Sequence, residues 1–392
     1  MKTKLIIFGI TGDLSQRKLV PVLEQVVQDV ADIEIIGVSR RQVEVASVVT
    51  EPLVPLTRMV AMDLAEADDY VRLRDDVALS DDEQALVYLS VPPSAAADIV
   101  DFLGRAGFNS NNVKLLFEKP FGFDLETATE FLSRTAQYFS EDQIYRIDHY
   151  AAKELSQRLI ELRANAETHH HRWSKESVAA VEIIASETIG VEDRAFFYEQ
   201  TGALRDFLQG HLLQLLALVA MDTSGDFTMD VLPERRLEAL ERIEEATTAQ
   251  TLRAQYEGYD AAVENPGSLT ETFVHMELRS ADERWSGVPF TLTTGKALDK
   301  KRSLVCIHYT DGTEEVFDEA DSAPEQGRKK DAYERVLLEA IAGNKAIFTT
   351  GPEVLRAWEI VAPVQEAWGM DGEQPDRYPQ GATITEVISS VE

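Results

Sequence analysis

The feature that most constrains the fold is an alternation of short apolar runs with amphipathic, helix-length stretches through the first 150 residues. The apolar runs, which have the length of buried strands, are Lys4–Ile10, Ile33–Val38, Ala85–Val91, Val113–Phe117 and Gln143–Ile147. Stretches with helical periodicity lie between them, at Leu14–Val30 (with a kink expected at Pro21), Ala95–Gly107 and Leu125–Phe139. Strands that alternate with helices of this length form parallel β-α units. We therefore predict an α/β domain with a doubly wound parallel sheet.

The pattern changes near residue 150, where strands and helices become segregated. Val178–Ser186 is rich in β-branched residues, and two long helical stretches follow, at Gly202–Met221 and Pro233–Thr248. The next strand-like segments have no helix between them: Thr272–Arg279, Val288–Thr293, Leu304–Tyr309 and Glu314–Phe317. A polar loop at Asp318–Lys330 precedes two closing helices, at Asp331–Ala342 and Pro352–Trp368. Segregated runs of this kind predict an α+β domain whose sheet is mainly antiparallel.

The charge balance limits the classes of partner. The chain has 38 Lys and Arg residues against 69 Asp and Glu residues, a formal net charge of −31. Proteins that bind nucleic acids or anionic membrane surfaces present clusters of basic residues, so we expect neither kind of partner. An anionic small molecule would need positive side chains gathered in its pocket against this overall charge.

Compartment and metal content are predicted from a few further features. The single cysteine, Cys306, excludes a disulfide within the chain and a cysteine metal cluster. No apolar run has the length of a membrane span, and the apolar stretch Leu5–Ile10 is too short for a signal peptide and lacks a cleavage site. We expect a cytoplasmic protein. The tract His169–His171 imitates a metal site, but no carboxylate stands at a coordinating spacing, so we predict a solvated loop and no metal.

A glycine-containing turn, Gly9–Leu14, lies between the first strand and the first helix. Glycines there allow a tight turn, and a helix N-terminus offers N–H groups to a pyrophosphate, although an ordinary strand–helix turn has the same composition. The second strand runs into Arg40 and Arg41 with no acidic residue in Gly37–Arg41. Arginine at this place suits the 2′-phosphate of NADP, whereas a carboxylate would suit NAD. The alternative is a solvated arginine pair. Lys18 would add positive charge nearby.

A second group of polar residues straddles the end of the strand Gln143–Ile147. It contains an acid, an imidazole, a phenol and an ammonium, from Asp148, His149, Tyr150 and Lys153. Doubly wound sheets bind ligands at the carboxyl ends of their strands, so this group predicts a catalytic edge. Lys119 ends the preceding strand and would orient nicotinamide or substrate. The alternative is an ordinary strand end whose polar residues have no catalytic role.

One histidine lies on the predicted helix Gly202–Met221. With α-helical periodicity, Phe207, Leu215 and Leu218 share a face with His211, so this side chain is predicted to point inward. A histidine among apolar neighbours is either a core residue or a base, and a base needs a carboxylate partner. Asp206 stands five residues before it and, in an α-helix, would lie on a different side.

These motifs together resemble the glucose-6-phosphate dehydrogenase family. The resemblance runs from Leu5 to about Arg302 and resumes near Asp331–Arg335. The segments that carry it are Gly9–Leu14, Glu118–Gly122, Asp142–Tyr150, His211–Gln214, Arg284–Phe290 and Gly295–Leu298. The resemblance implies an NADP-binding Rossmann-like domain over residues 1–150 and a substrate-binding and oligomerisation domain over residues 151–392, in a homodimer.

The resemblance also implies an activity and roles for individual residues. The activity is oxidation of D-glucose 6-phosphate at C1 to 6-phosphogluconolactone with hydride transfer to NADP, the first step of the oxidative pentose phosphate pathway. His211 would take the proton of the C1 hydroxyl, with Asp148 orienting it. The implied substrate-binding residues are His149, Tyr150 and Lys153 for the 6-phosphate, and Lys119, Glu187, Asp206, Lys296 and Lys301 for the rest of the sugar phosphate. The implied cofactor-binding residues are Gly9, Thr11, Gly12, Asp13, Leu14, Lys18, Arg40 and Lys119.

The sequence departs from the family pattern in three places. Ala152 replaces a usual glycine, and Lys301 stands where arginine is common, so a bidentate contact becomes a point charge. The segment from about Phe317 to Lys330 is much shorter than usual, and a glutamine that helps to hold the substrate is missing with it. Besides Val178–Ser186, only about four strand-like segments fit before Phe317, which predicts a smaller sheet and a weaker dimer.

Two other functions stay open at this stage. The same fold and base would serve the oxidation of another sugar or sugar phosphate. A non-catalytic NADP-binding regulatory protein is the second alternative, and the presence of both Asp148 and His211 disfavours it, because a binding module does not need a base.

Overall fold

A computed structural model describes residues 1–164, 173–224, 227–320 and 330–391. Contacts along the chain group it into two compact units. Unit 1 comprises Met1–Gly122, Glu126–Ala152 and Arg328–Gly351, and unit 2 comprises Phe123–Leu125, Lys153–Gly327 and Pro352–Glu392. The sequence places a single boundary near residue 150, whereas the contacts also assign a late segment of the chain to unit 1.

Unit 1 is built on a seven-stranded sheet with the order β13-β6-β5-β4-β1-β2-β3. Its strands are β1 (Lys2–Phe8), β2 (Ile33–Ser39), β3 (Thr57–Ala61), β4 (Glu83–Leu89), β5 (Val113–Phe117), β6 (Ile144–Ile147) and β13 (Phe348–Thr349). All neighbours pair in parallel except β13, which pairs antiparallel with β6. The doubly wound parallel sheet is thus confirmed. The strand order reverses between β1 and β4, and such reversals open a ligand crevice at the carboxyl ends of the strands.

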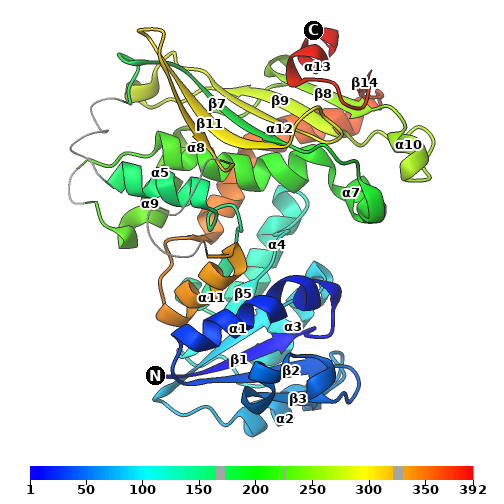
Figure 1. The fold of residues 1–392 in the computed structure, drawn as a ribbon, viewed down its shortest axis with the longest axis vertical. Helices are drawn as coiled ribbons and strands as arrows, with labels where there is room; N and C mark the ends of the chain where they lie inside the picture. The colour runs from blue at the N-terminus through cyan, green and yellow to red at the C-terminus, as the bar shows by residue number, and fades with distance from the viewer. Residues whose placement is uncertain (165–172, 225–226, 321–329, 392) are drawn as a thin grey trace. The chain divides into compact units, whose positions relative to one another are not determined.

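The helices of unit 1 cover this sheet (Figure 1). They are α1 (Val20–Asp29), α2 (Ala67–Val77), α3 (Pro93–Arg105), α4 (Leu125–Ala136, which begins at the last residue of a unit 2 segment) and α11 (Ala332–Ala342). Helices α1 and α11 lie side by side and share one buried cluster with β1, because the apolar faces of both helices meet there. The sequence reading missed β3 and α2, since the strand is half-exposed at the sheet edge and the helix is rich in charged residues.

The first helix does not run unbroken through Leu14–Val30 as predicted. A π-helical turn, Ser15–Leu19, comes first, and Pro21 then stands in the first turn of α1. Proline has no N–H to give to a carbonyl four residues earlier, so the regular α ladder cannot be completed there. The N–H of Val20 bonds instead to the carbonyl of Ser15, which widens the turn.

Unit 2 contains a second seven-stranded sheet, with the order β12-β11-β7-β10-β9-β8-β14. Its strands are β7 (Val178–Ser186), β8 (Thr251–Tyr256), β9 (Phe273–Leu278), β10 (Phe290–Gly295), β11 (Arg302–Tyr309), β12 (Glu314–Asp318) and β14 (Asp376–Tyr378). The pairs β7–β10 and β8–β14 are parallel and the rest antiparallel, so the mainly antiparallel sheet is confirmed. The expected strand number was too small, because β8 and β14 were not recognised.

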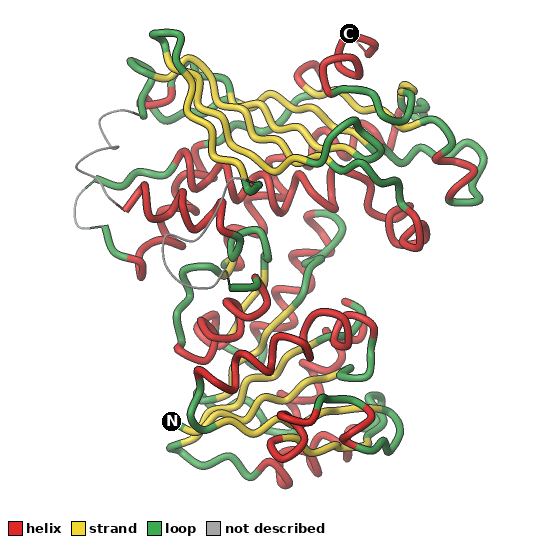
Figure 2. Tube along the Cα trace, viewed as in Figure 1, coloured by secondary structure: helices red, strands yellow, loops and turns green. Residues whose placement is uncertain are grey.

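Most helices of unit 2 gather on one face of this sheet, while α13 lies at its β8–β14 end (Figures 1 and 2). The helices of unit 2 are α5 (Glu154–Ala164), α7 (Ala195–Ala203), the π-helix η6 (Leu204–Leu212), α8 (Leu213–Ala220), α9 (Leu232–Arg242), the short α10 (Tyr259–Ala262), α12 (Gly351–Asp371) and α13 (Ile384–Val391).

Two helix predictions for unit 2 were wrong in extent, and the predicted end of the chain was wrong as well. Gly202 has φ 62° and ψ 179°, so the predicted helix Gly202–Met221 begins only after it and is π-helical in its first half. The helix predicted over Pro233–Thr248 ends at Arg242, and β8 follows soon afterwards. The chain does not close on two helices, because β14 and α13 come after α12.

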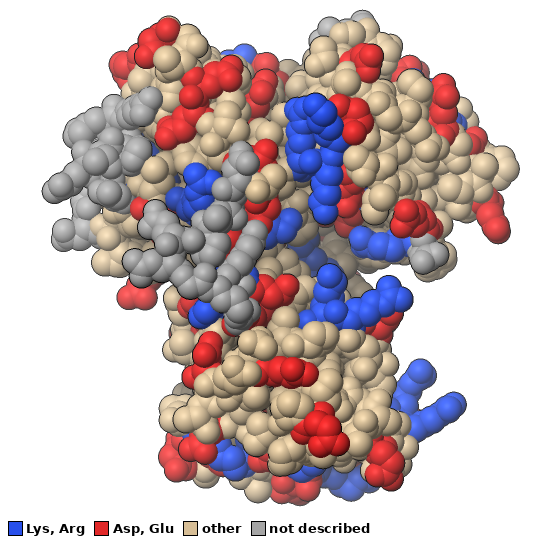
Figure 3. All heavy atoms as spheres, viewed as in Figure 1, with Lys and Arg blue, Asp and Glu red and all other residues tan. Residues whose placement is uncertain are grey.

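Acidic side chains are spread over the visible surface of both units rather than collected in one patch (Figure 3). In the part of the chain that the structure describes, no helix combines the length and the apolar composition of a membrane span. The tract His169–His171 and much of the loop Asp318–Lys330 lie outside the described residues.

Candidate active site

The first part of the site is the carboxyl edge of the parallel sheet in unit 1. Strands β1, β2, β4, β5 and β6 run in the same direction, so the segments that follow them meet at this edge. The turn after β1 begins at Gly9 with φ +77°, and a Cβ there would stand 2.3 Å from the carbonyl oxygen of Ser90. The hydroxyl of Ser15 also bonds to that of Ser90 at 2.8 Å. Glycine is therefore required where the ends of β1 and β4 approach each other.

The same turn offers a cradle that suits a dinucleotide. The N–H of Gly12 bonds to the Gly9 carbonyl at 2.8 Å, and the π-helical turn starts directly afterwards. The first N–H groups of a helical segment have no partners within it and favour an anion. After β2, the Ser39 hydroxyl bonds to the carbonyl of Arg41 at 2.7 Å, while the side chain of Arg40 is exposed. These residues fit a pyrophosphate on the turn and a further phosphate beside Arg40; Thr11, Asp13 and Lys18 are exposed around them.

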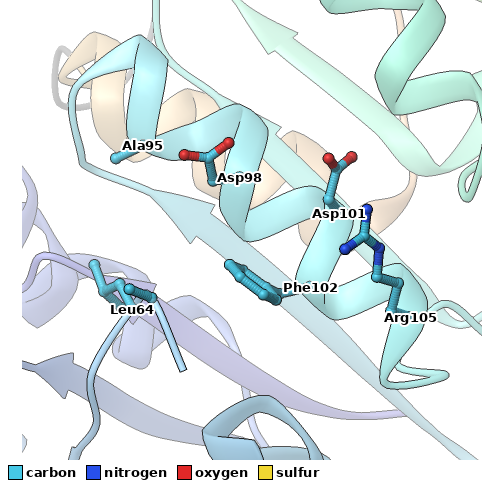
Figure 4. A pocket seen from close by; sticks show the side chains of 7 residues that line it. Leu64, Ala95, Asp98, Asp101, Phe102 and Arg105 are labelled. Atoms are coloured by element: carbon cyan, nitrogen blue, oxygen red, sulfur yellow. The ribbon is translucent and has the colours of Figure 1, made fainter. Parts of the chain in front are cut away.

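A separate cavity of about 490 Å³ lies along α3 (Figure 4). Asp98 and Asp101 line it, and both form ion pairs with Arg134, at 3.0 and 2.7 Å. None of the residues predicted for the site lines this cavity. Its acidic lining does not suit a phosphate, so we do not assign it to the dinucleotide's phosphates.

A hydrogen-bonded group at the ends of β5 and β6 fixes one of the predicted phosphate ligands. The carboxylate of Glu118 accepts a hydrogen bond from the Tyr88 hydroxyl and lies 3.0 Å from Nε2 of His149. The ring of His149 also packs on Tyr333 of α11, with 3.9 Å between the ring centroids. Because one side of the imidazole is paired and one face is covered, its orientation is set before any ligand arrives.

The neighbouring site residues in unit 1 are largely buried. Asp148 is 2% exposed, and its carboxylate accepts the backbone N–H of Tyr150 at 2.8 Å. Tyr150 is 8% exposed, and Lys119 is half-buried at the end of β5. The short turn after β6 thus holds a carboxylate in a fixed direction at the carboxyl edge of the sheet.

Unit 2 contributes a second group at the ends of two parallel strands. Glu187 follows β7 and Lys296 follows β10, and the pairing of these strands brings the two side chains together as an ion pair. Lys296 is only 7% exposed, and its ammonium lies 5.0 Å from the centroid of the Tyr198 ring. The pair is thus a fixed charge pair inside unit 2, with Glu187 the more accessible partner.

The π-helix η6 carries the two remaining polar residues of unit 2. His211 is half-buried rather than enclosed, and its ring packs edge-on against Phe207 at 5.1 Å. The inward orientation predicted for His211 is therefore only partly right. The expectation that Asp206 lies on another side of the helix assumed α-helical geometry. In a π-helix the hydrogen bonds join residues five apart, so positions 206 and 211 lie in successive turns of one side.

Comparison with known proteins accounts for both units. The N-terminal NAD binding domain of glucose-6-phosphate dehydrogenase matches residues 6–52 and 42–158. The C-terminal domain of the same protein matches residues 160–329 and 320–389. The chain belongs to the glucose-6-phosphate dehydrogenase family.

Individual relatives agree over nearly the full length. Glucose-6-phosphate 1-dehydrogenase of Mycolicibacterium smegmatis is 31% identical, with 96% of this chain and 93% of the relative covered. The enzyme of Dickeya dadantii is 29% identical, with the same coverage. The solved glucose-6-phosphate 1-dehydrogenase of Mycobacterium avium superposes with a TM-score of 0.85 at 27% identity, covering 97% of this chain and 94% of that one. A glucose-6-phosphate dehydrogenase solved with its substrate has the same fold, with a TM-score of 0.90 at 24% identity.

This glucose-6-phosphate dehydrogenase family member is shorter than those relatives. The alignment with the Dickeya enzyme extends over 459 positions, whereas the chain has 392 residues. The matches to the two family domains are interrupted at residues 42–52 and 320–329. The second interruption falls in the segment predicted to be short, and the first was not noticed in the sequence.

An acidic side chain lies beside the start of α5. The carboxylate of Glu319, just after β12, accepts the N–H of Leu155 at 2.9 Å, two residues after Lys153. Lys153 is half-buried, and Lys301, which precedes β11, is exposed. Glu319 therefore fixes the backbone two residues after the lysine that the family pattern places at the sugar phosphate.

Sequence reasoning missed two residues that hold the site together in unit 1. Glu118 and Tyr333 orient His149, and both belong to segments that carry the family resemblance. The signal was available for Glu118, because it precedes Lys119 at the end of β5. For Tyr333 it was not, since its packing on His149 depends on the return of residues 328–351 to unit 1.

Proposed function

We propose that this chain is an NADP-dependent glucose-6-phosphate dehydrogenase, which oxidises D-glucose 6-phosphate at C1 to 6-phosphogluconolactone. The observation that carries the proposal is the match to both family domains, together with the presence of the acid Asp148 and the base His211 that the motifs require. Oxidation of this substrate with NADP is the first step of the oxidative pentose phosphate pathway.

The proposed chemistry needs proton removal at the C1 hydroxyl while hydride leaves C1. His211 takes that proton, because neutral imidazole is the side-chain base available near pH 7. Asp148, whose carboxylate is already held by the Tyr150 N–H, orients the imidazole and stabilises the imidazolium that forms. NADP accepts the hydride when bound. At the end of a full turnover, His211 and Asp148 are each in the protonation state in which they began.

The remaining side chains bind and orient the sugar phosphate. His149, Tyr150 and Lys153 hold the 6-phosphate, and Lys301 adds a point charge to the same pocket. Lys119, Glu187, Asp206 and Lys296 hold the sugar hydroxyls. The basic residues among them would supply the local positive charge that an anionic substrate needs in a chain of net charge −31.

The proposed cofactor site is the turn after β1 together with the end of β2. Gly9, Thr11, Gly12, Asp13 and Leu14 form the cradle for the pyrophosphate, and Lys18 lies on the following π-helical turn. Arg40 reads the 2′-phosphate, since no carboxylate in Gly37–Arg41 competes for it. Lys119 contacts the nicotinamide end.

For assembly, we propose a homodimer formed through unit 2 and working in the cytoplasm, where the nucleotide cofactor is available. Support for the dimer is the edge strand β12, on which Val316 is 50% exposed. An exposed edge strand with apolar side chains favours pairing with a second chain.

The deciding experiment follows the absorbance of reduced NADP across a panel of sugars and sugar phosphates. Glucose 6-phosphate is expected to give the highest kcat/KM, and His211→Asn should lower kcat by about 10²–10⁴-fold with little change in KM. Turnover of this variant within a few-fold of the parent would refute the base, and a clear preference for another sugar would refute the substrate.

A further inference from the structure

Four potential metal ligands lie together on one face of the unit 2 sheet, and none of them is a residue of the proposed active site. Cys306 and His308 are two residues apart on β11, so their side chains share a face. Glu314 lies opposite His308 on β12, and Glu182 lies opposite Cys306 on β7. The register between β7 and β11 shifts just after His308, and such irregularities redirect neighbouring side chains.

The distances within this group suit a small cation. Nδ1 of His308 lies 3.1 Å from an oxygen of Glu314, and Nε2 lies 3.3 Å from an oxygen of Glu182. One ligand atom from each of Cys306, His308 and Glu314 lies within 4.8 Å of the other two. Tetrahedral zinc, with bonds of about 2.0–2.3 Å, separates its ligand atoms by about 3.3–3.7 Å, so small side-chain rotations would complete the site.

The charges in the group are compatible with a cation. Two carboxylates face a single imidazole, and the sulfur of Cys306 lies in the same group although the residue is only 6% exposed. A bound metal would displace the thiol proton and offset the negative charge of the carboxylates.

We propose that Cys306, His308 and Glu314 bind a Zn²⁺ ion, with Glu182 hydrogen-bonded to the second ring nitrogen of His308 and water at the fourth position. Sulfur and imidazole ligands select zinc over magnesium or calcium, which prefer oxygen. A carboxylate that holds the far nitrogen of a ligating histidine fixes the ring for the metal, which makes Glu182 a positioning residue. Cys306, His308 and Glu314 lie within nine residues on the neighbouring strands β11 and β12, but Glu182 comes from β7, so the complete group forms only in the folded sheet.

The test is a titration of the full-length, metal-free protein with Co²⁺, followed by competition with Zn²⁺. We expect one ion per chain and a thiolate-to-cobalt charge-transfer band that Zn²⁺ abolishes. Because Cys306 is the only cysteine, the band has a single possible source. Cys306→Ser should remove the band, and His308→Gln and Glu314→Gln should each weaken binding by 10-fold or more. Glu182→Gln should retain the band but lower the affinity by about 10–100-fold, as loss of an outer partner does.

A matched control is Glu277→Gln, which makes the same charge change on β9 of the same sheet, three strands away from β11. It should leave the band and the affinity unchanged, and thermal unfolding should show that all variants are folded. The proposal is wrong if the parent shows no charge-transfer band at one equivalent. It is equally wrong if Cys306→Ser, His308→Gln and Glu314→Gln bind Zn²⁺ as tightly as the parent does. Activity is not the readout, so failure here leaves the proposed function untouched.

Discussion

The ion pair between Glu187 and Lys296 predicts that these residues do not act independently on the substrate. Both are proposed to hold sugar hydroxyls, and each hydrogen bond to a charged group contributes about 1.5–3 kcal/mol, or roughly 10–150-fold in kcat/KM. Lys296 is only 7% exposed, so the position of its ammonium depends on the groups that surround it. Glu187→Gln removes the charged partner and leaves Lys296 with a weaker hydrogen bond and the Tyr198 ring.

We therefore expect the effects of the two single substitutions on kcat/KM to be non-additive in a double-mutant cycle. Glu187→Gln and Lys296→Met should each lower kcat/KM for glucose 6-phosphate by about 10–150-fold. The fold-loss of the double variant should be smaller than the product of the two single losses by roughly 5–30-fold, which corresponds to about 1–2 kcal/mol. Urea unfolding should show a larger loss of stability for Glu187→Gln than for Lys296→Met, because the first leaves a mostly buried charge poorly paired.

Lys300→Met is the matched control, since it makes the same change at an exposed lysine close to Lys296. It should leave kcat/KM within about 2-fold of the parent, as exposed substitutions away from a site do. If the double variant loses the product of the single losses to within about 0.5 kcal/mol, the two residues act separately and the reasoning is refuted.

Four further outcomes are expected. Arg40→Ala should reduce kcat/KM with NADP by roughly 10–150-fold, the worth of one charge-assisted contact, and spare NAD; equal losses with both coenzymes would contradict the 2′-phosphate assignment. Lys153→Ala should raise KM for glucose 6-phosphate far more than for free glucose, whereas an identical fractional loss would exclude contact with the phosphate. Glu83, which pairs with Lys4 at 2.7 Å, has a pKa lowered from 4.5 to about 2, mainly by that contact. Its carboxylate therefore stabilises the fold above pH 4.5 and loses this effect as the pH falls towards 2. Glu83→Gln should thus cost about 1–3 kcal/mol of unfolding free energy at pH 7 and progressively less below pH 4.5, and a constant difference down to pH 3 would be evidence against the pairing. Sedimentation equilibrium should show a dimer whose population rises with concentration and salt, and a strict monomer at high salt would exclude it.

The sequence predicts the fold well where a strand or helix has a clear hydrophobic pattern. The strands Val113–Phe117 and Val178–Ser186 were predicted with the bounds that the structure gives them. Both are apolar enough on their buried side for the pattern to be clear. Strand β14 has only three residues and one buried side chain, so no local pattern could identify it.

The site residues could be identified from motifs, but their geometry could not. Periodicity assumes 100° per residue, and the π-helix around His211 breaks that assumption, which is why Asp206 was placed on the wrong side. Pairings such as Glu187 with Lys296 follow from the parallel neighbours β7 and β10. These two strands are more than 100 residues apart along the chain. Pairing between such distant strands depends on the whole sheet, so it could not be predicted from a single sequence.

The return of residues 328–351 to unit 1 has a consequence for synthesis and for engineering. Strand β13 supplies the edge partner of β6, and the backbone oxygens of Ala340 and Ile341 accept hydrogen bonds from Lys114 and Gln84. A ribosome that has released the first 150 residues has therefore not yet produced everything that the nucleotide-binding sheet needs. A fragment cut after residue 152 lacks a strand and a helix of its own unit. An autonomous version of that unit should instead include the late segment, with residue 152 linked to residue 330.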